Sequence, residues 1–292
     1  MAGKKERDRR RARERYERRR QQHLQRRNKV RQWTGIGLAV ALVLGLAIGL
    51  SVAFVGGGSP KASASAKATG SKSASPSATP TASTIAEPAH HCTYTKAGTA
   101  AKKVSLPPAT PDYTASYTAT INTNRGKIDI DLLNSKATCT VNSFVHLAEA
   151  GFWNDSQCHR VSDSDEIYML QCGDPLAKAT TKLTCSEAAN APGSGTPGYE
   201  FASENLTGAT YKAGTVAMAN TGAADSNGSQ FFLVFKASDL EPDYTPFGTI
   251  TSGLDILQKV AAAGTTCTYA DVGGGAPKEK VIIESVTIKK KT

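Results

Sequence analysis

The longest run of apolar residues lies near the N-terminus, at residues 34–55, and contains no charged residue. A helix over residues 36–55 would be about 30 Å long, which matches the hydrocarbon core of a bilayer. Core helices are rarely apolar on every face over such a length. We therefore predict a transmembrane signal anchor at residues 34–55. A cleaved signal peptide is the alternative, because small residues at 62–66 fit a cleavage pattern, although the apolar run is longer than such peptides usually have.

Residues 56–109 follow the anchor and show no apolar period. Gly, Ser, Ala, Thr and Pro dominate this segment. Such a composition buries too little surface to offset the entropy of ordering the chain. We predict a disordered, flexible linker that holds a folded domain, residues 110–292, away from the anchor.

Alternation of apolar and polar residues begins the folded domain. Residues 113–122 alternate strictly, as expected of a half-buried strand. A turn signal at residues 124–126 is followed by a second alternating stretch, residues 128–132, so the two form a hairpin. Residues 280–288 form the last predicted strand. Other short strand-like runs lie between Gly- and Pro-rich loops, which predicts a mainly β domain built as a closed antiparallel barrel.

Two helices are predicted to cap this barrel. The first begins at Thr138 or Thr140, either of which can cap it, and ends at Gly151. The second covers residues 252–263 and ends at Gly264, with its leucines on one face.

The charge of the chain is concentrated in its first segment. Residues 1–33 hold 15 of the 35 Lys and Arg residues but only 4 of the 25 Asp and Glu residues. The positive-inside rule makes this segment a basic cytoplasmic tail and places everything after the anchor outside the cell membrane. Anionic lipid is a candidate partner of the tail. The rest of the chain is nearly neutral, so we expect no nucleic-acid partner.

Several short motifs follow one another in the folded domain. They are Cys158-His159-Arg160, the run from Met169 to Asp174 (MLQCGD), the run from Met218 to Gly222 (MANTG), the run from Asn227 to Phe232 (NGSQFF), and Phe247-Gly248. Their order and spacing resemble the cyclophilin family of peptidyl-prolyl cis-trans isomerases over roughly residues 113–290. With the anchor, the chain is similar to membrane-anchored bacterial cyclophilins. The resemblance implies an eight-stranded closed barrel with two capping helices.

The resemblance also implies a reaction that needs no cofactor and no metal. Amide resonance gives rotation about an X–Pro bond a barrier of about 18–20 kcal/mol. A catalyst needs a donor that favours the twisted state, in which the prolyl nitrogen becomes basic. A guanidinium suits this role because it stays protonated. The expected function is isomerisation of proline-containing exported polypeptides, and the alternative is a non-catalytic peptide-binding or chaperone module on the same fold.

Site residues are carried over by position in the motifs. The resemblance implies a catalytic set of Arg160, Gln171 and Phe232. It implies substrate contacts from Tyr168, Met169, Asn220, Gln230, Leu240, Tyr244 and Phe247. Phe247 fits core packing equally well. His159 has no partners typical of acid–base catalysis, and we interpret it as structural.

Six cysteines all lie after the predicted anchor, at positions 92, 139, 158, 172, 185 and 267. An even number outside the cytoplasm favours disulfides over buried free thiols, which are the alternative. Six cysteines allow 15 pairings, and the sequence does not select one. Cys158 and Cys172 flank Arg160 on two strands, so a pairing between or near them is plausible. Cys185 and Cys267 lie in predicted loops and are candidates for a separate disulfide.

Overall fold

The computed structural model describes residues 91–164, 167–186, 191–269 and 272–291. The predicted tail, the anchor at 34–55 and the linker up to residue 90 lie outside the described residues. Within the described ranges, no helix is long and apolar enough to cross a bilayer.

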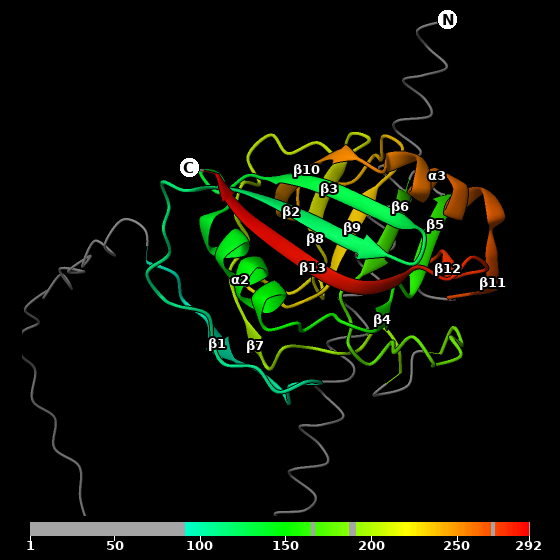
Figure 1. The fold of residues 1–292 in the computed structure, drawn as a ribbon, viewed down its shortest axis with the longest axis horizontal. Coiled ribbons are helices and arrows are strands. Elements are labelled where there is room, and N and C mark those ends of the chain that lie inside the picture. The colour runs from blue at the N-terminus through cyan, green and yellow to red at the C-terminus, as the bar shows by residue number, and fades with distance from the viewer. Residues whose placement is uncertain (1–90, 165–166, 187–190, 270–271, 292) are drawn as a thin grey trace, which may run out of the picture. The chain divides into compact units, whose positions relative to one another are not determined.

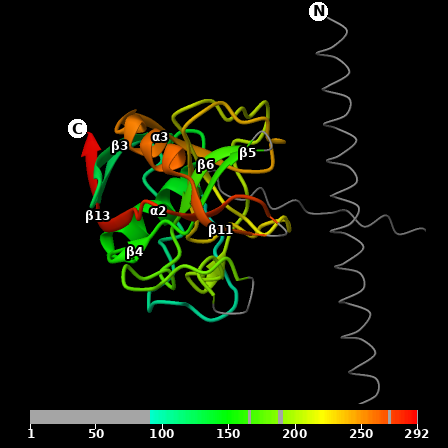
Figure 2. The same cartoon turned by 90° about the vertical axis from the view of Figure 1, so that its right-hand side faces the viewer.

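The described residues form a mainly β fold with two helices (Figure 1). The helices are α2 (Thr138–Glu149) and α3 (Leu254–Ala263). The strands are β1 (Thr95–Lys96), β2 (Ser116–Thr123), β3 (Gly126–Leu132), β4 (Ser156–Gln157), β5 (Arg160–Ser164), β6 (Ile167–Cys172), β7 (Tyr199–Glu200), β8 (Thr215–Met218), β9 (Phe231–Val234), β10 (Pro246–Ser252), β11 (Thr265–Thr268), β12 (Gly275–Pro277) and β13 (Ile282–Lys291). Figure 1 shows the two helices at opposite ends of the curved sheet, and in Figure 2, turned by 90°, α3 lies above α2.

The predicted N-terminal hairpin is confirmed as β2 and β3. Ile121 lies opposite Ile128, and Thr123 lies opposite Gly126 at the turn. Both isoleucines are buried, while the residues between them in the alternation are more exposed, which is the pattern the sequence shows. β13 adds to the other edge of β2 over most of its length, and the three strands run side by side in Figure 1.

The sheet is not the closed ring of eight strands that we expected. Eleven described strands follow the order β11-β12-β5-β6-β9-β8-β10-β3-β2-β13-β4, and β1 pairs separately with β7. The reason lies at Cys158 and His159, the two residues between β4 and β5. The Cys158 N–H donates to the Val281 carbonyl and the His159 N–H donates to the Gln171 carbonyl. The chain therefore changes partner from the β13 side to β6, instead of pairing with both strands at once.

The N-terminus of α2 is capped by a side chain that is distant in the sequence. Neither Thr138 nor Thr140, the residues predicted for this role, provides a side-chain cap. Instead the carboxylate of Glu204 accepts hydrogen bonds from the N–H of Cys139 at 3.0 Å and of Thr140 at 2.7 Å. A carboxylate is favourable there because the helix N-terminus carries partial positive charge.

Both helices end at the glycines that the sequence indicated. Gly151 follows α2 with a φ of 57°, and Gly264 follows α3 with a φ of 79°. Glycine adopts such backbone angles readily because it has no Cβ. α3 begins at Leu254, two residues later than predicted, because Gly253 before it also has a positive φ.

Residues 91–109, which we expected to belong to the linker, pack against the domain. Cys92 is buried and forms a disulfide with Cys139 in α2. The Tyr94 hydroxyl donates to the Cys139 carbonyl at 2.8 Å, and β1 pairs with β7. The boundary predicted at residue 110 is therefore too late. A disulfide, a tyrosine side chain and backbone hydrogen bonds hold a segment that has no apolar period.

All six cysteines are paired. The disulfides are Cys92–Cys139, Cys158–Cys172 and Cys185–Cys267. The last two are the pairings that we considered plausible from the sequence. The alternative of buried free thiols is therefore wrong for this structure.

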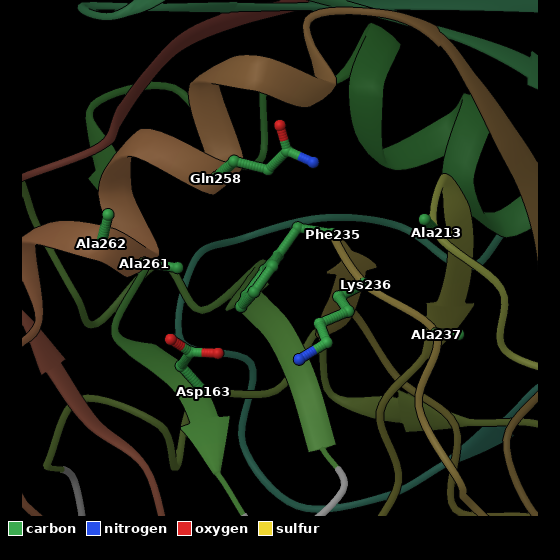
Figure 3. Close-up of a pocket in the computed structure, with 8 residues that line it drawn as sticks. All are labelled: Asp163, Ala213, Phe235, Lys236, Ala237, Gln258, Ala261 and Ala262. Atoms are coloured by element: carbon green, nitrogen blue, oxygen red, sulfur yellow. The ribbon is translucent and has the colours of Figure 1, made fainter.

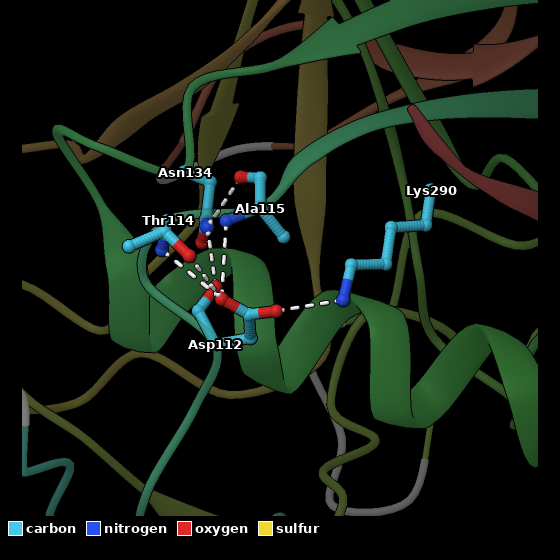
Figure 4. A network of polar contacts seen from close by, with 5 residues as sticks. All are labelled: Asp112, Thr114, Ala115, Asn134 and Lys290. Carbon is cyan, nitrogen blue, oxygen red and sulfur yellow. Dashed lines mark hydrogen bonds and ion pairs between the residues drawn. The ribbon is translucent and has the colours of Figure 1, made fainter. Parts of the chain in front are cut away.

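A polar network joins the start of the sheet to the C-terminal strand (Figure 4). The Asp112 carboxylate accepts hydrogen bonds from the N–H and hydroxyl of Thr114 and from the N–H of Ala115. The carboxylate also pairs with the Lys290 ammonium at 2.7 Å. The Asn134 side-chain amide donates to the backbone carbonyl of Asp112. The bond to Lys290, followed by that to Thr114, lowers the pKa of Asp112 to about 2.

This network predicts an acid-dependent contribution to stability. Because the pKa of Asp112 is lower in the folded state, its contribution is present above about pH 4 and is lost as the pH falls toward 2. Asp112→Asn should lower the melting temperature slightly at pH 6 and weaken its decrease between pH 4 and 2. Lys290→Met should reproduce part of this effect. Parallel curves for wild type and Asp112→Asn, measured by circular dichroism, would contradict the assignment.

Candidate active site

The three residues predicted for catalysis lie side by side on adjacent strands. Arg160 of β5 lies opposite Gln171 of β6, and Gln171 lies opposite Phe232 of β9. Directly opposed residues in antiparallel strands share one face of the sheet and contact one another. The register therefore brings a cation, an amide and an aromatic ring into one row, although 72 positions separate the first from the last.

The Arg160 guanidinium is held by three acceptors among the described residues. Nη1 donates to Gln171 Oε1 at 3.0 Å, and Nε donates to the Gly273 carbonyl at 2.8 Å. Nη2 donates to the Val272 carbonyl. These contacts fix the plane of the guanidinium. Both carbonyls belong to the turn between β11 and β12, far from β5 in sequence.

Gln171 is held in turn by Gln230. Gln171 Nε2 donates to Gln230 Oε1 at 3.0 Å, and Gln230 Nε2 donates to the carbonyls of Gly193 and Gly195 at 2.9 and 3.0 Å. The result is a chain of hydrogen bonds that runs from one loop, through two glutamines, to the arginine. The neighbours of each side-chain amide determine which of its ends donates and which accepts. Gln171 therefore presents its oxygen, Oε1, to Arg160.

A small apolar cluster lies beside this row. Its buried members are Met169, Tyr211, Ala217, Phe232 and Val234, and Leu240 and Tyr244 pack against it half-buried. The Phe232 and Tyr244 rings meet edge to face with centroids 5.5 Å apart. Four of the predicted site residues, Met169, Phe232, Leu240 and Tyr244, are thus brought together.

Sequence reasoning missed Tyr211 in this cluster. Its hydroxyl donates to the Tyr244 carbonyl at 2.8 Å and accepts from the Tyr244 N–H at 3.0 Å. It therefore holds the backbone that carries the Tyr244 ring. Its only sequence signal is an aromatic residue shortly before the strand at 215–218, and that signal does not distinguish a site residue from a core residue.

The Arg160 guanidinium stays charged at neutral pH because the ordinary pKa of arginine is far above 7. Burial lowers the pKa of the Arg160 guanidinium, and the nearby hydroxyls of Tyr244 and Tyr269 act in the opposite direction. Burial also raises the pKa of Tyr244, with a further contribution from Asp243, and Arg160 opposes this. At neutral pH the site therefore presents a cation beside a neutral phenol.

Two predicted contact residues lie elsewhere. Tyr168 is next to Met169 on β6, so its side chain lies on the opposite face, in the main core beside Phe235. The Lys236 ammonium lies 4.1 Å from the centre of the Tyr168 ring. Phe247 is fully buried in the same core, 5.1 Å from the ring of Phe144 in α2. Of its two interpretations, core packing is therefore the correct one.

Asn220 lies just after β8, at the margin of the row. Its Nδ2 donates to the Asp243 carbonyl at 2.8 Å, and its Oδ1 accepts from the Gly222 N–H at 3.0 Å. The neighbouring Ala219 N–H donates to the Gln230 carbonyl. The Asn220 side chain is thus engaged within the protein, which leaves its backbone for the predicted contact with a substrate.

His159 is buried behind the row. It precedes Arg160 and so points to the other face of the strand, where it approaches Gly193. Its Nδ1 has no hydrogen-bond partner among the described residues. Burial, aided by the Arg160 charge, lowers the pKa of His159 to about 3. The imidazole is therefore neutral at physiological pH, consistent with our structural interpretation.

The buried imidazole predicts a pH dependence of stability. An unfolded histidine has a pKa near 6.5, so the unfolded chain binds one more proton than the folded chain below that pH. The free energy of unfolding should fall by about 1.4 kcal/mol per pH unit below pH 6 from this residue. His159→Gln should flatten this slope between pH 6 and 4.5 and keep most of the turnover. Urea titrations test this, and an unchanged slope would contradict it.

A cavity of about 410 Å³ lies away from the row (Figure 3). Its lining comes from β5, α3, the residues just before β8 and the residues just after β9, and comprises Asp163, Ala213, Phe235, Lys236, Ala237, Gln258, Ala261 and Ala262. None of the residues predicted for catalysis lines it. The candidate site is therefore the row of Arg160, Gln171 and Phe232 rather than this cavity.

Comparison with known proteins identifies the family. The family model "Cyclophilin type peptidyl-prolyl cis-trans isomerase/CLD" matches residues 118–288. A Mycobacterium leprae protein named "Probable peptidyl-prolyl cis-trans isomerase B" is 38% identical over 214 residues, which are 68% of this chain and 66% of that protein. Its namesake in Mycobacterium tuberculosis H37Rv is 39% identical over 204 residues, 65% of this chain and 60% of that protein. The chain thus spans somewhat less than two thirds of these relatives.

A solved structure of a cyclophilin-type isomerase from Cryptosporidium parvum is 22% identical, with a TM-score of 0.49, and covers 61% of this chain and 99% of that chain. The matched segment, residues 118–288, is more than half of the chain and includes every residue of the row. The chain therefore belongs to the cyclophilin-type peptidyl-prolyl cis-trans isomerase family.

Proposed function

We propose that the protein is a peptidyl-prolyl cis-trans isomerase that accelerates X–Pro rotation in exported polypeptides outside the cytoplasmic membrane. One observation carries the proposal. Arg160, Gln171 and Phe232 are direct neighbours on β5, β6 and β9, so a fixed guanidinium lies beside an apolar cluster. Family membership supports the same activity.

The chemistry follows from the twist of the amide. As the X–Pro bond rotates, its resonance is lost and the prolyl nitrogen gains a lone pair that can accept a hydrogen bond. Arg160 stays protonated and donates to that nitrogen in the twisted state. This contact is stronger in the transition state than in the planar ground state, which is the requirement for catalysis.

The other residues hold the substrate and the arginine. The prolyl ring packs against Phe232 and Met169, both buried members of the apolar cluster. Gln171 orients Arg160 through the 3.0 Å hydrogen bond. Asn220 and Gln230 meet the peptide backbone at the margin of the row. No step requires acid–base catalysis, so a neutral His159 is compatible with the reaction.

A non-catalytic chaperone on the same fold is the second candidate. It would need the apolar cluster but not an arginine whose guanidinium is fixed by three acceptors. That ordered guanidinium favours the enzyme.

The proposed location rests on the sequence and on the cysteines. The uncharged run at 34–55 follows a basic tail, which favours a single-pass anchor with a cytoplasmic N-terminus. Disulfides persist in oxidising compartments, and each of the six cysteines of the chain forms a disulfide. Anionic lipid is a proposed partner of the tail.

Two measurements test the proposal on the full chain. The chain in lipid vesicles should accelerate cis-to-trans conversion of a short X–Pro peptide, and peptide binding without acceleration would favour the chaperone. In cells that express the chain, added protease should digest or release the C-terminal domain. A domain that survives until the cells are opened would show the orientation to be wrong.

A further inference from the structure

The hydrogen-bonded chain through the site ends on a different loop at each side. At one end, Gln230 donates to the carbonyls of Gly193 and Gly195. At the other end, Arg160 donates to the carbonyls of Val272 and Gly273. Four backbone carbonyls from two loops therefore set the positions of the side chains between them.

A disulfide joins the two described segments that precede these loops. Cys185 lies eight residues before Gly193 in the chain, and Cys267 is in β11, five residues before Val272. The Cys185–Cys267 disulfide links them across a sequence separation of 82 residues. The sulfurs also accept backbone hydrogen bonds, from the Cys185 N–H to Cys267 Sγ and from the Ala276 N–H to Cys185 Sγ. The disulfide is thus part of the β11–β12 hairpin.

We propose that the Cys185–Cys267 disulfide is a positioning element for Arg160. It holds the β11–β12 turn so that the Val272 and Gly273 carbonyls fix the guanidinium in the orientation that the reaction needs. The inference rests on the proposed function of Arg160.

The attachment of the hairpin to the sheet explains why a covalent link matters. β11 is the outermost strand of its sheet and pairs only with β12 among the described strands. β12 joins β5 through one register pair, Gly275 with Val161. The Tyr269 hydroxyl adds a hydrogen bond of 3.5 Å to the His159 carbonyl. Among the described residues, few hydrogen bonds therefore join the hairpin to β5, while Arg160 depends on its turn for two of its three acceptors.

The opposite loop is fixed independently. The Asp174 carboxylate accepts hydrogen bonds from the N–H groups of Gly193 and Gly195. Asp174 directly follows β6 and Gly173, so this loop is tied to the strand that carries Gln171. On the Cys185 side, the Thr181 carbonyl accepts a hydrogen bond from Gln157 Nε2 at 2.7 Å, so the disulfide anchors the hairpin to a segment that β4 already holds. Loss of the disulfide should displace the Arg160 end of the row and leave the Gln230 end in place.

The Cys92–Cys139 disulfide supplies a matched control. It ties residues 91–109 to α2 and touches none of the residues in the hydrogen-bonded chain. Its removal deletes one disulfide and costs stability without altering the acceptors of Arg160. The Cys158–Cys172 disulfide is unsuitable because Cys172 ends β6 and Cys158 lies only two residues before Arg160.

The experiment compares Cys185→Ser/Cys267→Ser with Cys92→Ser/Cys139→Ser in the full chain in vesicles. Circular dichroism at low temperature establishes that each variant is folded. We expect Cys185→Ser/Cys267→Ser to lower kcat about tenfold with little change in KM. This loss is smaller than the roughly 10²-fold that a 1 Å misplacement can cost. Cys92→Ser/Cys139→Ser should keep the wild-type kcat. If Cys185→Ser/Cys267→Ser does not fold, Cys185→Ala/Cys267→Val replaces it, because these side chains fill the space with apolar atoms.

Both disulfide variants are also made in an Arg160→Ala background. There the Cys185–Cys267 change should have no further effect on turnover, because its effect passes through the arginine. A folded variant that lacks the Cys185–Cys267 disulfide but keeps the wild-type kcat overturns the inference. An equal loss of kcat from removal of either disulfide also overturns it. So does a loss of kcat that is just as large in the Arg160→Ala background. Full turnover by Arg160→Ala alone would instead show that the proposed function of Arg160 is wrong.

Discussion

Replacing Arg160 by alanine is expected to lower the turnover of an X–Pro peptide by about 10²–10³, with a much smaller effect on peptide affinity. The guanidinium makes its strongest contact only when the prolyl nitrogen is twisted out of the amide plane, so its loss raises the barrier more than it weakens binding. The measurement is catalysed isomerisation at several peptide concentrations, which separates kcat from KM.

Two variants serve as controls for this result. Arg125→Ala removes an exposed arginine that pairs with Glu279, far from the row in the β2–β3 turn, and should keep wild-type turnover. Arg160→Lys keeps the charge but loses the planar fork that reaches Gln171, Val272 and Gly273, so it should recover only part of the rate. Near-full turnover by a folded Arg160→Ala protein would end the assignment.

Phe232→Ala, unlike Arg160→Ala, should lower both the stability of the domain and its affinity for the peptide. Phe232 is 4% exposed and contacts Tyr211 and Tyr244 within the apolar cluster. Truncating a buried phenylalanine costs about 3–5 kcal/mol of unfolding free energy. The same change removes the surface on which the prolyl ring packs, so KM should rise and kcat should fall. Urea titration and the isomerisation assay give the two quantities.

Phe235→Ala provides the comparison, because Phe235 is buried to a similar degree but lies in the main core beside Tyr168. It should cost a similar free energy of unfolding and leave KM close to the wild-type value at low temperature. If both variants raise KM alike, Phe232 has no special part in binding proline and acts only as a core residue.

Local patterns predicted the elements that depend on neighbours in sequence. The β2–β3 hairpin and the glycines that end α2 and α3 follow from period and backbone angle. Tyr168 was misassigned although the same rule applies to it, because adjacent residues of a strand face opposite ways and Met169 already lies on the site face. The family resemblance assigns Tyr168 to the site by its position in the motif, whereas the strand alternation assigns it to the core. The structure agrees with the alternation.

Contacts between distant segments could not be predicted in this way. Glu204 caps α2 from 64 residues beyond Thr140, and no local pattern links the two. The carbonyls of Val272 and Gly273 reach Arg160 from more than 100 residues away. The motifs identified the arginine, but what orients it depends on how the β11–β12 hairpin folds back onto β5.

The Cys92–Cys139 disulfide also determines how the domain would bear tension. A pull on the chain from its N-terminal side reaches Cys92 first and passes through sulfur directly to α2. The 46 residues between the two cysteines, which include β2 and β3, lie in a covalently closed loop, so the pull does not act along their backbone. Under the proposed membrane tether, drag on a bound client would therefore be transmitted to a helix rather than peel the central hairpin from the sheet.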